Sequence, residues 1–192
     1  IVGYTSMMQK DELQALAIVR RHNSVVQENA KIHAGEVVNF YGDGCLAVFP
    51  SAFEAVQCAV DIQKELRNDL VVPVRIGLHI GEIFFEDGKV IGDGVNVASR
   101  VQSLGQANTI LVSAEIKDKI KNRSEFKTIS LGSFEFKNVD RPMEVFALDI
   151  EGLNVPRPES LEGKLKPGIS NVNKRNKSKA MPVIITLLVF VA

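Results

Sequence analysis

The chain has 192 residues, which is enough for one globular domain of about 150 residues with further segments. Lys and Arg total 23 and so do Asp and Glu, so the net charge does not point to any charged partner. Two cysteines, Cys45 and Cys58, lie in apolar surroundings, which excludes a disulfide framework and is consistent with a reducing compartment.

The first fifty residues predict a helix followed by a β-hairpin. Residues 11–34 place apolar side chains along one side of a helix. Residues 37–41 and 45–49 are rich in strand formers, and a Gly-Asp-Gly sequence at 42–44 joins them. This arrangement puts the carboxylate of Asp43 at the turn between two strands.

The middle of the chain predicts a helix, a strand and a hairpin-like arm. Ser51 and Glu54 form a capping box for a helix that ends near residue 67. Apolar residues alternate with others from 74 to 80, which predicts a strand with one apolar face. Residues 82–90 then form an arm with a turn of acidic residues and glycine.

A second Gly-Asp-Gly sequence opens the helix with the most informative side chains. Asp93 is positioned to cap this helix, and Asn96 and Arg100 are four residues apart, so both project from one face. The remaining predicted elements are a strand at 109–112, a helix that Ser113 caps and that ends near 121, and a closing antiparallel pair at 126–136 and 143–150. This order of elements predicts an α+β fold with a ferredoxin-like antiparallel sheet and helices packed on it.

The C-terminal part predicts two segments outside this domain. Residues 151–180 combine charges with prolines and glycines, which is typical of a linker. Residues 181–192 carry no charge, and we interpret them as the start of a transmembrane helix that the sequence cuts off; the alternative is an apolar tail or the last helix of a soluble fold. The basic run 174–179 then places the preceding domain in the cytoplasm, at the inner membrane, and fits a juxtamembrane anchor better than a nucleic-acid site.

Three local features together indicate nucleotide chemistry. The guanidinium of Arg100 is a rigid, permanently charged fork suited to phosphate oxygens. Asp43 offers a carboxylate for a metal ion, and residues 1–5 (Ile-Val-Gly-Tyr-Thr) form a strand end that enters a turn of small residues. A carboxylate, a turn for phosphates and a distant Asn/Arg pair are the parts that a nucleotide site needs.

At this point the sequence resembles the class III nucleotidyl cyclase catalytic domain, the family of adenylate and guanylate cyclases, of the bacterial, membrane-tethered type. The resemblance covers residues 1–150 and rests on five blocks in family order: IVGYT, YGDGCLAVF, VRIGLHIGE, GDGVNVASR and ILVS. The Gly-Gly-Asp/Glu-Glu-Phe run of diguanylate cyclases does not occur. The predicted organisation is therefore a nucleotide cyclase domain at 1–150 whose N-terminal strand is cut off, followed by a charged linker at 151–180 and the start of a membrane segment at 181–192.

The resemblance implies an adenylate cyclase that converts ATP to 3′,5′-cyclic AMP and pyrophosphate with two Mg²⁺ or Mn²⁺ ions per site. In the family pattern, Asp43 and the backbone carbonyl of Ile1 match metal ligands, and Asn96 and Arg100 match the catalytic pair that orients the ribose and stabilises the transition state. The expected substrate-binding residues are Gly3, Tyr4, Thr5, Asn39, Lys89 and Lys137. The family assembles each site between two domains, which implies a homodimer with shared sites.

Two departures from the family pattern leave alternatives open. Asn39 and Lys89 stand where adenylate cyclases usually carry Lys and Asp or Thr, and where guanylate cyclases carry Glu and Cys. The family's other metal-binding Asp falls just before Ile1, outside this sequence. The alternatives are a guanylate cyclase, or a degenerate domain that binds nucleotide or acts as a dimerisation module.

Overall fold

The computed structural model describes residues 1–86, 89–137, 139, 141–157, 161 and 186–191. Its helices are α1 (Tyr4–Lys10), α2 (Glu12–Ile32), α3 (Ala52–Glu65), α4 (Asp93–Leu104) and α5 (Ala114–Ile120). Its strands are β1 (Glu36–Tyr41), β2 (Gly44–Phe49), β3 (Arg75–Gly81), β4 (Phe84–Glu86), β5 (Lys89–Ile91), β6 (Thr109–Ser113), β7 (Thr128–Phe134), β8 (Met143–Leu148) and β9 (Thr186–Val191).

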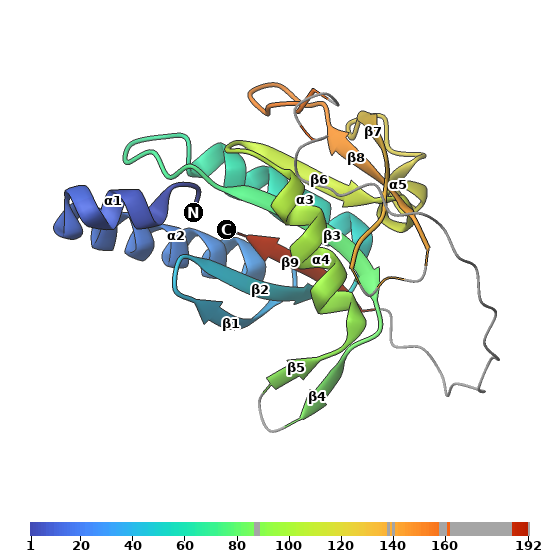
Figure 1. Ribbon diagram of the computed structural model, residues 1–192, viewed down its shortest axis with the longest axis horizontal. Helices are drawn as coiled ribbons and strands as arrows, with labels where there is room; N and C mark the ends of the chain where they lie inside the picture. Colours follow the sequence, from blue (N-terminus) through green and yellow to red (C-terminus); the bar gives the residue numbers. More distant parts are fainter. Residues whose placement is uncertain (87–88, 138, 140, 158–160, 162–185, 192) are drawn as a thin grey trace.

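Seven strands form one sheet in the order β1-β2-β9-β3-β6-β8-β7, and β4 pairs with β5 in a separate ribbon (Figure 1). Every neighbouring pair in the large sheet is antiparallel except β3 and β6. The predicted hairpins, β1–β2 and the β4–β5 arm, are confirmed, as is the closing pair of β7 and β8. The fold is the α+β architecture expected from the order of elements.

Helices cover both faces of the large sheet because its strands alternate apolar side chains between them. One face packs against α2, α3 and α5 in the main core, which includes Cys45, Phe49, Ile76 and Leu78. On the other face, α4 packs through Val97 and Val101 against β6 and β8, and through Ala98 against β2. Figure 1 shows α4 crossing this second face, with the β4–β5 arm projecting away from the body.

Local sequence signals explain where the main helices begin. Asp11 caps α2 by accepting a hydrogen bond from the Gln14 amide, and Ser51 caps α3 by accepting one from the Glu54 amide. The prediction that Asp93 caps α4 is wrong. Gly92 is the N-cap residue, no side chain caps this helix, and Asp93 is its first residue.

The C-terminal segments differ from the predictions. Within 151–161, Val155 and Leu161 pack against the core beneath α4, so this first part of the predicted linker lies on the domain. Residues 181–192 were predicted to begin a membrane helix, but the structure places Thr186–Val191 as β9 in the large sheet. Among the described residues, no helix is long and apolar enough to cross a membrane. Residues 181–185 and 192 lie outside the described part.

Candidate functional site

The first part of the candidate site is the turn between β1 and β2, which carries Asp43. Gly42 takes φ +60°, a conformation that glycine adopts without a Cβ penalty, and the Asp43 side chain is 40% exposed. The Ile1 amino group donates to the Asp43 carbonyl oxygen at 2.6 Å and lies 3.6 Å from Asp43 Oδ2. The structure therefore brings together the two residues that were predicted as metal ligands.

The start of the chain is held against the body around this turn. Ile1 is buried, and the Val2 amide donates to the Pro73 carbonyl at 2.7 Å. Gly3 then takes φ +79° as the N-cap of α1, and Tyr4 packs against the main core while Thr5 is exposed. The backbone of residues 3–5 therefore begins two residues after Ile1, which contacts the Asp43 turn.

Burial lowers the pKa of two bases near the turn. Burial lowers the pKa of the Ile1 amino group, and the neighbouring Asp43 carboxylate opposes this shift. Burial also lowers the pKa of His22, on α2, to about 4; its Nδ1 lies 2.9 Å from Asn23 Oδ1. His22 is therefore neutral at pH 7. The charges of Ile1 and Asp43 both act on it, so it belongs to the surroundings of the turn.

The second part of the candidate site is the outer face of α4. Asn96 is exposed and Arg100 is half-buried, and their spacing puts them on one side of the helix. Glycines let α4 approach β3 closely. A Cβ on Gly77 would collide with the backbone of Gln102, and one on Gly81 would lie 2.5 Å from the Gly94 Cα. The position of Asn96 and Arg100 is thus fixed by backbone-to-backbone packing.

The remaining predicted residues lie apart from these two groups. Asn39 is exposed on β1, and Lys89 is on β5 in the separate ribbon, where its backbone pairs with Glu86. Lys137 is exposed after the end of β7. Among the described residues, no hydrogen bond or ion pair joins Asp43 to Asn96 or Arg100. Within one chain, the carboxylate and the guanidinium thus form two separate half-sites.

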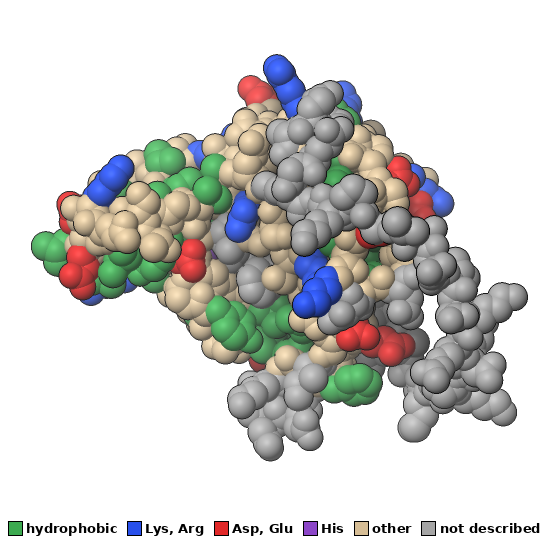
Figure 2. Space-filling view, in the orientation of Figure 1, with side chains coloured by type: hydrophobic (Ala, Val, Ile, Leu, Met, Phe, Trp, Pro, Cys, Tyr) green, Lys and Arg blue, Asp and Glu red, His purple; other side chains and the backbone are tan. Residues whose placement is uncertain are grey.

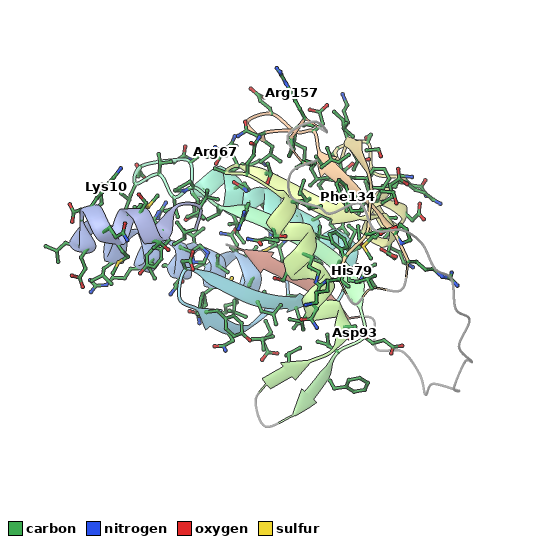
Figure 3. All side chains as sticks on the ribbon, in the orientation of Figure 1. Lys10, Arg67, His79, Asp93, Phe134 and Arg157 are labelled. Atoms are coloured by element: carbon green, nitrogen blue, oxygen red, sulfur yellow. The ribbon has the colours of Figure 1, made fainter. Side chains whose placement is uncertain are left out.

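The sequence interpretation missed the glycines and a buried polar pair beneath the site. His79 on β3 (labelled in Figure 3) has Nδ1 3.0 Å from Ser113 Oγ and 3.7 Å from Glu115 Oε2, and burial lowers its pKa. Ser113 stands at the N-cap position of α5, as predicted, but its hydroxyl contacts His79 and caps nothing. The glycines have a signal in the sequence, since Gly77 interrupts an apolar strand, whereas the histidine pairing has none.

Comparisons with known proteins agree with the geometry. A family model described as the adenylate and guanylate cyclase catalytic domain matches residues 1–149. The putative adenylate cyclase 3 of Rhizobium meliloti (strain 1021) is 33% identical over 153 residues, which are 76% of this chain and 26% of that protein. The chain thus spans about a quarter of the length of that relative.

Two solved structures show the same fold. An adenylate/guanylate cyclase/hydrolase from Silicibacter pomeroyi is similar with a TM-score of 0.64 and 31% identity, over 73% of this chain and 84% of that one. The guanylate cyclase domain of RhGC from Catenaria anguillulae, in complex with GTP, has a TM-score of 0.65 and 22% identity, over 78% of this chain and 92% of that one. At that identity, the second likeness concerns the fold alone.

Proposed function

Because this chain belongs to the adenylate and guanylate cyclase catalytic domain family, we propose that it is an adenylate cyclase, which converts ATP to 3′,5′-cyclic AMP and pyrophosphate. The observation that carries the proposal is the outer face of α4, where Asn96 and Arg100 share one side of a helix that packs closely on β3. Relatives named as adenylate cyclases from Rhizobium meliloti and Glutamicibacter nicotianae support ATP as the substrate.

The reaction is an attack of the ribose 3′-hydroxyl on the α-phosphorus with departure of pyrophosphate. Arg100 stabilises the negative charge that develops on the phosphoryl oxygens, because a fixed guanidinium acts without reorganisation in the transition state. Asn96 donates to the ribose and orients its 3′-hydroxyl toward the phosphorus. The backbone amides of Gly3, Tyr4 and Thr5 bind the phosphates, and Lys137 neutralises their terminal charge.

The family generally uses divalent metal ions, and the Asp43 turn fits such an ion in part. The turn presents the carbonyl oxygen and the carboxylate of Asp43 beside Ile1. Within the described ranges, no group of three His, Cys, Asp or Glu side chains could hold a metal ion. We assign the Asp43 carboxylate and the Ile1 carbonyl as ligands of Mg²⁺ or Mn²⁺, two per site. Such ions would activate the hydroxyl and neutralise phosphate charge.

A homodimer completes the site, because the carboxylate and the guanidinium of one chain do not meet. Dimerisation is typical of the family. The β4–β5 arm projects from the body and exposes 67% of Phe84, and Tyr41 at the end of β1 is also exposed. Figure 2 shows hydrophobic side chains at the surface over β1 and β2 and on the arm. We expect this surface to be covered by a second copy, which brings its Arg100 to Asp43.

Recognition of the purine base is assigned to Asn39 and Lys89. The Asn39 amide both donates and accepts, so it can pair with the edge of adenine, whereas Lys89 only donates. A guanylate cyclase is the alternative outcome, since a donor at residue 89 suits the O6 acceptor of guanine. These two residues would therefore determine whether the enzyme takes ATP or GTP.

Incubation of the protein with ATP or GTP, in the presence of Mg²⁺ or Mn²⁺, tests this function directly. We expect cyclic AMP from ATP, measured by chromatography, and its loss in the Arg100→Ala variant. Arg123→Ala is the matched control, because Arg123 stacks on Phe53 at 4.5 Å, away from α4. Cyclic GMP instead of cyclic AMP would reassign the substrate. If the folded dimer makes no cyclic product from either nucleotide, the chain is not a cyclase, and the remaining alternative is a nucleotide-binding or dimerisation module.

A further inference from the structure

One side chain of β3 lies between the two glycines that bring this strand against α4. Alternate residues of a strand point to the same face, so Gly77, His79 and Gly81 all face α4. Leu78 and Ile80 point to the other face, where they contact the main core. Between residues 77 and 81, all of which the structure describes, the imidazole of His79 is therefore the only side chain that β3 places on the α4 face.

Helix α4 runs alongside β3 in the opposite direction. Its residue Gly94 lies against Gly81, and its residue Gln102 lies against Gly77. Eight helical residues span about 12 Å and four strand residues span about 13 Å, so the two elements stay aligned between these contacts. Ala98, which is completely buried and midway between the two helix contacts, therefore comes opposite the histidine.

Asn96 and Arg100 lie on the side of α4 opposite this contact. Successive residues of an α-helix are about 100° apart around its axis, so each of the two lies about 200° from Ala98. A movement of α4 toward or away from β3 would therefore carry both side chains inward or outward by the same amount. The distance between the helix and the strand sets how far the two side chains project from the domain.

The close approach of α4 leaves no room for an imidazole directly between the strand and the helix. A Cβ on residue 81 would lie 2.5 Å from the Gly94 Cα and 3.3 Å from His79 Cδ2. The ring extends toward β6 instead, where its Nδ1 lies 3.0 Å from Ser113 Oγ. Residues 79 and 113 are neighbours in the sheet because Leu78 pairs with Val112, and both polar side chains are buried.

The imidazole is neutral in this contact. Burial lowers the pKa of His79 from its usual 6.5, and the Glu115 carboxylate, 3.7 Å from Nδ1, opposes the shift. The ring is therefore uncharged at pH 7, and a neutral amide can replace it as a partner of Ser113. Loss of the hydrogen bond would leave a buried hydroxyl unpaired, which is unfavourable.

We propose that His79 is a positioning residue for the cyclase reaction, because its hydrogen bond with Ser113 holds the imidazole beside α4 and so sets the distance of Asn96 and Arg100 from the sheet. A ring without this partner could turn toward Ala98, and α4 would have to move outward. The part of the inference that concerns packing involves α4, β3 and β6 alone. The part that concerns catalysis rests on the proposed function.

Two substitutions of the same shape separate the hydrogen bond from the volume of the side chain. Asn and Leu branch at the same atom, but only Asn can donate to or accept from Ser113 Oγ. We expect His79→Asn to keep most of its kcat and His79→Leu to lose about tenfold, since a displacement of about 1 Å costs on the order of 100-fold in rate. Equal kcat values for the two variants would overturn the proposal.

Leu78→Val is the matched control for lost stability. Leu78 is next to His79 along β3, but it packs in the main core on the other face of the sheet. We expect this variant to unfold at a lower urea concentration than the wild type and to keep its kcat. If Leu78→Val loses as much kcat as His79→Leu at a similar stability, the histidine has only a structural role and the proposal fails.

Ser113→Ala removes the same hydrogen bond from its other end. We expect its kcat to fall to about that of His79→Leu, while the KM for ATP changes little, because Arg100 acts in the transition state. A double variant with both changes should lose no more than either single variant, since each breaks one shared contact. Losses that multiply in the double variant would contradict the proposed pairing.

Hydrogen exchange tests the packing without an activity measurement. We expect the amides of α4 (Asp93–Leu104) to exchange about tenfold faster in His79→Leu than in His79→Asn, whereas those of α3 (Ala52–Glu65) should not differ. The same exchange in α4 of both variants would overturn the inference on packing. If α4 differs as expected but the wild type makes no cyclic nucleotide, the proposed function fails, and the catalytic part of this inference fails with it.

Discussion

The Asp43 turn and helix α4 carry the two halves of the candidate site, and they are held by different kinds of contact. Helix α4 lies directly on β3 through glycines, and Gly77 meets the backbone of Gln102. The Asp43 turn is held by the Ile1 amino group and by a hairpin that reaches the rest of the sheet through β9. The backbone that carries Arg100 is therefore held by core packing, whereas the turn that carries Asp43 depends on contacts with residues far from it along the chain.

The largest expected effect is the loss of activity when one charged group is removed from either half of the site. We expect Asp43→Ala and Arg100→Ala each to lower kcat by about 10²–10³, because each removes an interaction that strengthens in the transition state. Both side chains contact solvent, so the free energy of unfolding should change by no more than about 1 kcal/mol. Initial rates and urea unfolding on the same preparations measure both quantities. A variant that keeps its rate would exclude that residue from the site.

Acid should destabilise the region of the Asp43 turn through His22. Its pKa is about 4 in the folded protein and 6.5 when exposed, so between these values the unfolded chain binds more protons. The free energy of unfolding should therefore fall by about 3 kcal/mol as the pH drops from 6.5 to 4, and the dependence from this residue ends below pH 4. Urea unfolding at several pH values measures it.

Two histidine variants identify the source of that pH dependence. In His22→Leu the fall should shrink by about the same 3 kcal/mol, since no base remains to be protonated. His33→Leu is the control, because His33 lies near the surface between Glu54 and Asp61. An unchanged profile in His22→Leu would show that His22 does not contribute.

A pair of glycine substitutions compares the packing of the two regions. Gly77→Ala places a methyl group against the Gln102 backbone, so we expect a loss of about 2 kcal/mol in the free energy of unfolding. Gly42→Ala meets no atom within 4 Å and costs only its left-handed conformation, about 1 kcal/mol. Equal losses at the two positions would contradict the difference in packing between α4 and the turn.

The sequence predicted well those features that depend only on residues close together in the chain. The Ser51 cap, the hairpin at residues 42–44 and the shared face of Asn96 and Arg100 follow from spacings of a few residues, and the structure has all three. Asp93 failed as a cap because Gly92 takes φ +154° beside the carbonyl of Glu82, and that close approach depends on tertiary packing. The roles of Asn39, Lys89 and Lys137 stay predictions.

The structure gives Thr186–Val191 as a strand where the sequence favoured the start of a membrane helix, and the membrane segment stays a prediction. A short uncharged run after a basic cluster has the same composition whether it forms a membrane helix or a strand buried on both faces. What distinguishes the two in the structure is the pairing with β2 and β3, whose residues lie more than a hundred positions away. A pairing over that separation leaves no periodic signal in the segment itself.

The most direct test of the shared site mixes the two inactive variants. A dimer of Asp43→Ala with Arg100→Ala contains one site with both changes and one site that is intact. With random reassociation, half of the dimers are mixed, so we predict recovery to about one quarter of the wild-type rate. If the mixture is shown to be dimeric and to exchange subunits but regains no activity, that result would contradict a site built from two copies.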